Sequence, residues 1–189
     1  MKLTNYFLYL SFNHKKKPMK IEFIKSLFIA VALGAGISSC SVATKSVEVE
    51  SASQIFQFED IYSEENTASL TVIVTDLLSN KVEIGNMESA VIQSITLSKN
   101  DSIGLSEINS AKLHIMGEKL PILTVGLITS IEEGAKSVTF EILDDLEIED
   151  YLKAENITLV LDVNYLNDND NSQKFEVGIN FGLEMIEQN

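Results

Sequence analysis

Few residues in this chain could supply nucleophilic chemistry. Cys40 is the only cysteine, and the two histidines are His14 and His114. A hydrolytic triad needs a nucleophile, a histidine and an orienting carboxylate in mutual contact. His114 lies between Leu113 and Ile115, so in a strand it would point away from the apolar face, and the sequence contains no GxSxG, SxxK or HExxH motif. We therefore expect a strand histidine and no enzyme.

Paired carboxylates are the second candidate chemistry, because sugar hydrolysis needs only two of them. Acidic residues are so frequent here that neighbouring pairs arise by chance, and the chain has no tryptophan and only five tyrosines to form a sugar platform. A carboxylate-based hydrolase is therefore kept only as an alternative. The candidate acids are Glu132 and Glu133, Asp144 and Asp145, and Glu147, Glu149 and Asp150.

The run Asn167–Asn171 (NDNDN) alternates hard oxygen ligands, as the opening of a calcium loop does. Counted from Asp168, the glycine position of an EF-hand holds Gln173, and the closing acidic position holds Ile179. The run is therefore not an EF-hand, and we interpret it as a solvated hairpin loop between two strands. Asp168 and Asp170 remain calcium candidates, and we predict no cofactor.

The N-terminal part of the chain has the organisation of a secretory signal. Lys20 and Lys25 form a short basic region, and Ser26–Ile37 (SLFIAVALGAGI) is mostly apolar or small. About a dozen such residues are too few for a membrane-spanning helix, which needs roughly 20, but they fit a cleavable signal. Residues 1–18 extend the basic region beyond what a signal needs, so we expect translation to start at Met19.

The sequence Ile37-Ser38-Ser39-Cys40 resembles the lipobox of bacterial lipoproteins, in which small residues precede the cysteine. The resemblance covers residues 19–41. It implies cleavage between Ser39 and Cys40, a diacylglyceryl group on the Cys40 sulfur and an acylated (palmitate) amino terminus. Acyl chains contribute about 0.8 kcal/mol per buried CH₂, so several would hold the protein on a membrane. Some Gram-negative lipoproteins with Asp after the cysteine stay in the inner membrane, whereas Ser41 favours the outer membrane.

Asp101-Ser102-Ile103 matches the Asp-Ser/Thr-aliphatic sequon of some bacterial periplasmic O-glycosylation systems. Three-residue matches are common, and a turn containing Asp and Ser explains the same residues. Ser102 is therefore a candidate O-glycosylation site, and an ordinary turn is the alternative.

The charge distribution excludes some partners. The formal net charge is −14, but residues 1–39 hold six lysines and one acid, whereas residues 40–189 hold eight lysines and 27 acids, and no arginine occurs. Arginine is the usual bidentate ligand of phosphate, and an acidic surface repels phosphate backbones. We therefore predict no nucleic-acid partner. The expected partners are a membrane, through the lipid anchor, and an envelope protein or glycan.

Apolar residues that alternate with polar ones predict the fold. The segments with this pattern are Leu70–Val74, Val91–Leu97, Ala111–Ile115, Val138–Ile142, Ile157–Tyr165 and Phe175–Met185. Turn residues separate them, and seven to nine short strands are expected in all. The pattern predicts an all-β, antiparallel two-sheet β-sandwich of immunoglobulin-like or jelly-roll type over residues 54–189.

Two further segments complete the predicted organisation. After the leader (residues 1–39), residues 40–53 are small, polar and free of aromatics, so they predict a flexible tether. One short helical turn is expected at Asp144–Ala154, where Asp144 and Glu147 have the spacing of a capping box. The mature chain is thus predicted to be a lipid-anchored envelope lipoprotein that binds or scaffolds without catalysis. A surface glycan-binding or adhesion accessory protein, with or without assistance by calcium, is the main alternative.

Overall fold

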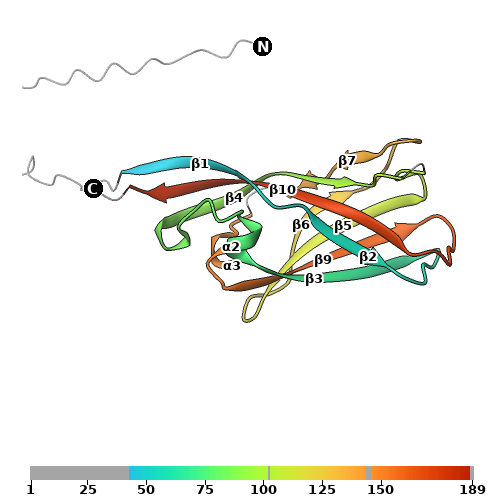
Figure 1. Ribbon diagram of the computed structural model, residues 1–189, viewed down its shortest axis with the longest axis horizontal. Coiled ribbons are helices and arrows are strands. Elements are labelled where there is room, and N and C mark those ends of the chain that lie inside the picture. The colour runs from blue at the N-terminus through green and yellow to red at the C-terminus, as the bar shows by residue number, and fades with distance from the viewer. Residues whose placement is uncertain (1–42, 102, 144–145, 188–189) are drawn as a thin grey trace, which may run out of the picture. The chain divides into compact units, whose positions relative to one another are not determined.

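The chain folds into two β-sheets that enclose an apolar core (Figure 1). The computed structural model describes residues 43–101, 103–143 and 146–187, all within the compact unit Val42–Asn189. All strand pairs are antiparallel. The predicted antiparallel β-sandwich is therefore confirmed.

The described residues form ten strands, more than the seven to nine predicted, because two of them are very short. Sheet A has the order β1-β10-β4-β7, and β2 also pairs with β10. Its strands are β1 (Thr44–Glu50), β2 (Gln54–Phe58), β4 (Met87–Ser98), β7 (Ser137–Thr139) and β10 (Gln173–Ile186). Sheet B has the order β3-β9-β5-β6-β8. Its strands are β3 (Glu65–Ile73), β5 (Ile108–Gly117), β6 (Leu123–Ile128), β8 (Glu141–Ile142) and β9 (Asn156–Tyr165).

The described helices are single turns: α2 (Val74–Leu77), the 3₁₀ turn η1 (Ile84–Asn86) and α3 (Glu149–Leu152). α3 lies inside the predicted helical segment, but its N-cap is Ile148 and no side chain caps it. The predicted capping box is therefore wrong. Within the described residues, no helix is long and apolar enough to span a membrane.

The core takes one side-chain row from each long strand, as alternation predicts. The buried rows of β9 and β10 are Ile157, Leu159, Leu161, Val163 and Tyr165, and Phe175, Val177, Ile179, Phe181 and Leu183. Each large apolar side chain contributes about 1.5–3 kcal/mol when fully buried. Met185, the last residue of the predicted β10 row, is only partly buried.

The flexible tether predicted for residues 40–53 is wrong for half of its length. Thr44–Glu50 is β1, and all seven of its residues pair with β10. In this segment Val47 and Val49 alternate with polar residues, and Val49 is buried. The alternation that marks the other strands was therefore present here as well. Only residues 41–43 separate Cys40 from the first strand.

The loop at Asn167–Asn171 is not a hairpin. It joins β9 of sheet B to β10 of sheet A, so it crosses from one layer to the other. Alternation shows only that each strand has a buried face. Because the two sheets share one core, the same pattern fits a strand of either sheet and does not show to which sheet a strand belongs.

The predicted strand Val138–Ile142 is also divided between the sheets. β7 pairs with β4 in sheet A, and β8 pairs with β6 in sheet B. Phe140, between them, is buried. Gly126 of β6 leaves room for this ring, because a Cβ atom there would lie 2.9 Å from the Phe140 Cβ and 3.1 Å from the Ile95 Cδ1.

Val91 was predicted to be on the buried face of β4, but it is 51% exposed. The pairing of β4 with β10 shifts by one residue between Ile92 and Ser94, which leaves Gln93 as an extra residue. Such a bulge moves the following side chains to the other face. Ile92 is therefore buried before the bulge, and Ile95 and Leu97 are buried after it.

Candidate functional site

The outer face of sheet B carries mostly polar side chains from four adjacent strands. Cross-strand pairing places Thr67 beside Asp162, and Asp162 beside Lys112. It also places Thr71 beside Thr158. The outer face of sheet B is defined here as Thr67, Ser69 and Thr71 of β3, Thr158, Val160 and Asp162 of β9, Lys112, His114 and Met116 of β5, and Thr124 of β6.

Hydrogen bonds cross this face from strand to strand. His114 Nδ1 lies 2.9 Å from Thr124 Oγ1, and His114 Nε2 lies 3.0 Å from Asp162 Oδ2. Thr67 donates its hydroxyl to Asp162 Oδ1 over 2.6 Å. The side chains of His114 and Asp162 are only 13% and 18% exposed. The chain of contacts therefore ties β6, β5, β9 and β3 together through side chains.

Thr124, His114 and Asp162 have the group types of a hydrolytic triad, and the sequence did not show that they meet. His114 does project opposite the buried Leu113 and Ile115, as predicted. A hydrolytic triad also needs oxyanion donors and a cleft beside its nucleophile. One end of this face has a groove, described in the next paragraph, but none of these three residues lines it. The geometry is that of side-chain hydrogen bonds between neighbouring strands.

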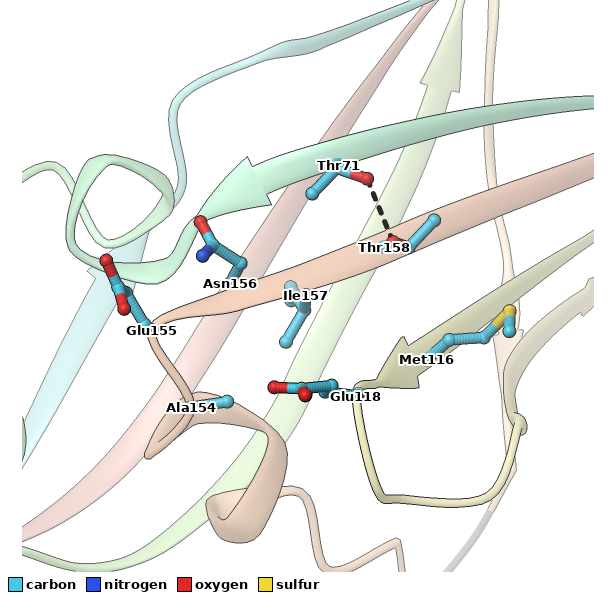
Figure 2. A pocket seen from close by; sticks show the side chains of 9 residues that line it. Thr71, Met116, Glu118, Ala154, Glu155, Asn156, Ile157 and Thr158 are labelled. Carbon is cyan, nitrogen blue, oxygen red and sulfur yellow. Dashed lines mark hydrogen bonds between the residues drawn. The ribbon is translucent and has the colours of Figure 1, made fainter.

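A groove of about 350 Å³ lies at one end of the outer face of sheet B. Its lining comprises Thr71, Met116, Gly117, Glu118, Ala154, Glu155, Asn156, Ile157 and Thr158. Figure 2 shows the carboxylates of Glu118 and Glu155, the amide of Asn156, and the hydroxyls of Thr71 and Thr158, which lie 3.0 Å apart. These groups can hydrogen-bond the hydroxyls of a polar ligand. Among the described residues, no aromatic side chain lines the groove, so none of them offers a stacking platform there.

Sequence reasoning did not single out Glu118 or Glu155. Glu118 directly follows β5, and Glu155 directly precedes β9. Because β5 and β9 are antiparallel, with Gly117 opposite Ile157, the two acids come to one end of the sheet. Only knowledge of this strand pairing could have selected them from the 28 acidic residues of the chain.

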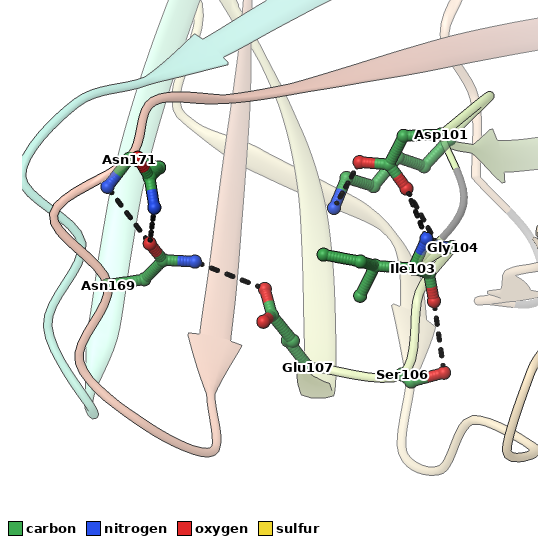
Figure 3. Close-up of polar contacts among 8 residues, drawn as sticks. Asp101, Ile103, Gly104, Ser106, Glu107, Asn169 and Asn171 are labelled. Carbon is green, nitrogen blue, oxygen red and sulfur yellow. Dashed lines mark hydrogen bonds and ion pairs between the residues drawn. The ribbon is translucent and has the colours of Figure 1, made fainter.

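Hydrogen bonds also join the loops at the end of the sandwich where β4 leads into β5. Figure 3 shows Asp101 Oδ1 accepting from the N–H groups of Ile103 and Gly104, at 3.0 and 2.8 Å. The β6–β7 loop is attached to the same turn, because Gly134 N–H donates to Ser106 Oγ over 3.1 Å. The turn predicted around Asp101 is therefore present.

Asp101 also pairs with a buried lysine. Lys99 is 4% exposed, and its Nζ lies 2.8 Å from Asp101 Oδ2 and 5.7 Å from the centre of the Phe175 ring. Desolvation raises the pKa of Asp101, but the hydrogen bond and charge of Lys99 and the N–H groups of Gly104 and Ile103 outweigh it. The pKa of Asp101 is therefore lowered from its ordinary value.

The calcium candidates do not form a metal centre with other described acids. Asp168 Oδ1 accepts a hydrogen bond from the Ser63 N–H, and this contact lowers the pKa of Asp168. The neighbouring Asn169 donates to Glu107 Oε2 over 3.3 Å, and its Oδ1 accepts from Asn171 (Figure 3). Among the described residues, no group of three or more His, Cys, Asp or Glu is placed to hold a metal ion.

The other predicted site residues are spread over the fold. Glu132 and Glu133 lie in the β6–β7 loop, while Glu149 and Asp150 belong to α3 and Glu147 precedes it. None of these acids lines the groove on sheet B. The remaining predicted positions lie outside the described residues: Ser39, Cys40, Ser102, Asp144 and Asp145.

The fold and these sites define an antiparallel β-sandwich with a polar sheet face and hydrogen-bonded end loops. No protein-family model matches the sequence, and no curated protein matches it. Solved structures show distant likenesses. One is the semi-empty virus-like particle of the nodavirus of the giant freshwater prawn Macrobrachium rosenbergii, with 8% identity, a TM-score of 0.38, and 95% of this chain and 96% of that chain covered.

Two other structures have lower TM-scores. Cocksfoot mottle virus shares 8% identity at a TM-score of 0.32, with 98% of each chain covered. A structure of carbohydrate-binding modules from the β-sandwich superfamily shares 8% identity at a TM-score of 0.32, over 75% of this chain and 57% of that chain.

Proposed function

We propose that the protein is a lipid-anchored lipoprotein of the bacterial cell envelope, in the outer membrane, and that its β-sandwich binds a partner without catalysis. The observation that carries the proposal is the order of three features: the basic residues Lys20 and Lys25, the apolar run Ser26–Ile37, and the lipobox-like sequence that ends at Cys40. A lone cysteine at this point suits an anchor.

The structure adds a constraint on how the anchored domain would be held. Residues 41–43 are all that separate Cys40 from β1, and four residue-to-residue steps span at most about 14 Å. β1 is paired along its whole length with β10, the longest strand. The proposed anchor thus holds the sandwich close to the bilayer surface, which suits a partner located at that surface.

Substitution of the cysteine tests the anchor. We expect Cys40→Ser to abolish labelling by a fatty-acid probe and to release the protein from the membrane fraction. Ser41→Ala changes the adjacent residue without removing the thiol and should keep both properties. Labelling that persists in Cys40→Ser, or is absent from the unchanged protein, would contradict the proposal.

A glycan is the second candidate ligand, because Glu118, Glu155 and Asn156 line one groove together with two threonine hydroxyls. Carboxylates and amides are suited to bind sugar hydroxyls, and hydrogen bonds to charged groups contribute about 1.5–3 kcal/mol each. This candidate depends on polar contacts alone.

Oligosaccharides released from the envelope provide the probe for the groove. If one of them binds there, Glu118→Gln and Glu155→Gln should each weaken binding by about tenfold or more. Glu48→Gln, on β1 of the other sheet, is the matched control. Equal binding by all three variants would exclude the groove as the glycan site, and an effect of chelator on binding would indicate a calcium-assisted mode.

A further inference from the structure

Sheet B ends at a strand whose main chain is open on one side. β3 pairs with β9 along Glu65–Ile73, and no other described strand is hydrogen-bonded to it, although β2 of sheet A lies close by. Within the described part of the chain, main-chain hydrogen bonds of residues 67–73 go only to β9. Figure 1 shows β3 along the margin of the sandwich. An open edge of this length is a template for another strand.

The other outer strands carry features that discourage such pairing. β1 has three charged residues, Lys45, Glu48 and Glu50. β2, which pairs only with β10, is also uncharged but has only five residues, and β7 and β8 have three and two. Charge and shortness are the usual protections of sheet edges. β3 has neither, because residues 66–73 (NTASLTVI) contain no charge, proline or glycine.

The inner side chains of β3 are also incompletely covered. Ala68, Leu70 and Val72 face the core but are only partly buried, whereas Leu159 and Leu161 of the adjacent β9 are completely buried. An added strand would cover this apolar row and satisfy the open main chain together.

We propose that β3 pairs antiparallel with β3 of a second copy of this chain, so that two copies of sheet B form one ten-stranded sheet. The charge distribution leaves this edge as a place where two acidic copies can meet. The mature chain holds 27 acids and eight lysines, so two copies repel one another over most of their surface. At residues 66–73 both copies are uncharged, and neither presents a charge that would attract a basic partner.

The side-chain pattern fixes a register for this pairing. In an antiparallel sheet, opposite residues point to the same face. With Leu70 on the two-fold axis, Leu70 lies opposite Leu70 of the second copy, and Ala68 lies opposite Val72. The partly buried apolar rows of the two copies then cover each other, and Ser69 lies opposite Thr71 on the outer face.

The symmetry of this dimer is compatible with the anchor, a point that rests on the proposed function. A two-fold axis perpendicular to the sheets keeps both copies of sheet A in one layer. The axis reverses the strands, so the two β1 strands lie in one layer and start at opposite ends of the dimer. Both Cys40 anchors enter one bilayer when the outer face of sheet A lies against it. The outer faces of the two B sheets then point away from the membrane side by side.

Molecular mass in solution tests the pairing independently of lipidation. The mature Cys40→Ser chain should be a dimer by sedimentation and light scattering. Ser69→Lys places a charge on an outward-facing position of β3 and should yield a folded monomer that still melts cooperatively, with a melting temperature that no longer depends on protein concentration. Glu48→Lys, on β1, should remain a dimer. A monomeric parent chain, or a Ser69→Lys variant that stays dimeric, would overturn the proposal.

A cross-link tests the register. In the Cys40→Ser chain, which has no other cysteine, Leu70→Cys should give a covalent dimer with a short thiol cross-linker, and Val47→Cys on β1 should not. Equal cross-linking of both variants would overturn the proposal. Hydrogen exchange of β3 in the parent chain provides a second test. If envelope extract slows this exchange but higher protein concentration does not, the edge of β3 pairs with another protein and the proposal is overturned.

Discussion

The two faces of sheet B are built by the same strands but depend on different interactions. The inner face is a layer of fully buried aliphatic side chains: Leu113, Ile115, Leu159 and Leu161. The outer face depends on hydrogen bonds among Thr124, His114, Asp162 and Thr67. The stability of the inner face therefore depends on side-chain volume, and that of the outer face depends on hydrogen bonding. Substitutions on the two faces should change the free energy of unfolding by different amounts.

The largest effect is expected where the inner face is tightest. Gly126→Val forces side-chain atoms against Phe140 and Ile95, where even a Cβ would be within 2.9 and 3.1 Å. Overpacking of this kind costs about 1–3 kcal/mol or more, which urea denaturation measures. Gly178→Val is the matched control in β10, because a Cβ at Gly178 meets nothing within 4 Å. Equal losses in both variants would show that packing around Phe140 is not the constraint.

An intermediate effect is expected on the outer face. Asp162→Ala removes the acceptor of both His114 and Thr67, and leaving partly buried donors unpaired costs about 1–3 kcal/mol. Lys112→Ala removes only an exposed contact with Glu65 and should change the free energy of unfolding by less than about 1 kcal/mol. The comparison would fail if Lys112→Ala proved the more destabilising of the two.

The smallest effect is expected at Asp101, whose side chain is about half exposed. Its pKa in the folded protein lies below the ordinary value of 3.8, so the ion pair with Lys99 stabilises the fold above that pH. This stabilisation is lost as the pH falls through the lowered pKa. Melting curves from pH 7 to strongly acidic pH should show a difference between the parent and Asp101→Asn that shrinks with acidity.

Asp170→Asn controls for the loss of one negative charge at an exposed position in a neighbouring loop. A difference between the parent and Asp101→Asn that stays constant down to acidic pH would mean that the pair with Lys99 contributes nothing through its charge.

Alternation in the sequence was sufficient to predict the sandwich and the buried rows of β5, β9 and β10, because burial of one face imposes a period of two. It was also present in β1, where the small polar residues around Val47 and Val49 suggested a tether instead. The bulge at Gln93 reverses the faces within β4, and a single apolar pattern cannot show where such a residue is inserted.

The candidate sites were less accessible to sequence reasoning, because they depend on which strands are neighbours. His114 and Asp162 are 48 residues apart and meet only because β5 pairs with β9. Glu118 and Glu155 share a groove for the same reason. The division of Val138–Ile142 between two sheets depends on Gly126, whose missing side chain becomes meaningful only beside Phe140.

The central proposal is that the mature protein begins at a lipid-modified Cys40, with β1 starting four residues later, at Thr44. Mass spectrometry of the N-terminal peptide, from protein extracted from membranes in detergent, tests this most directly. We expect a peptide that begins at Cys40 and carries the added mass of a diacylglyceryl group and an acyl chain. A peptide that begins elsewhere, or a Cys40 with a free thiol, would contradict the claim.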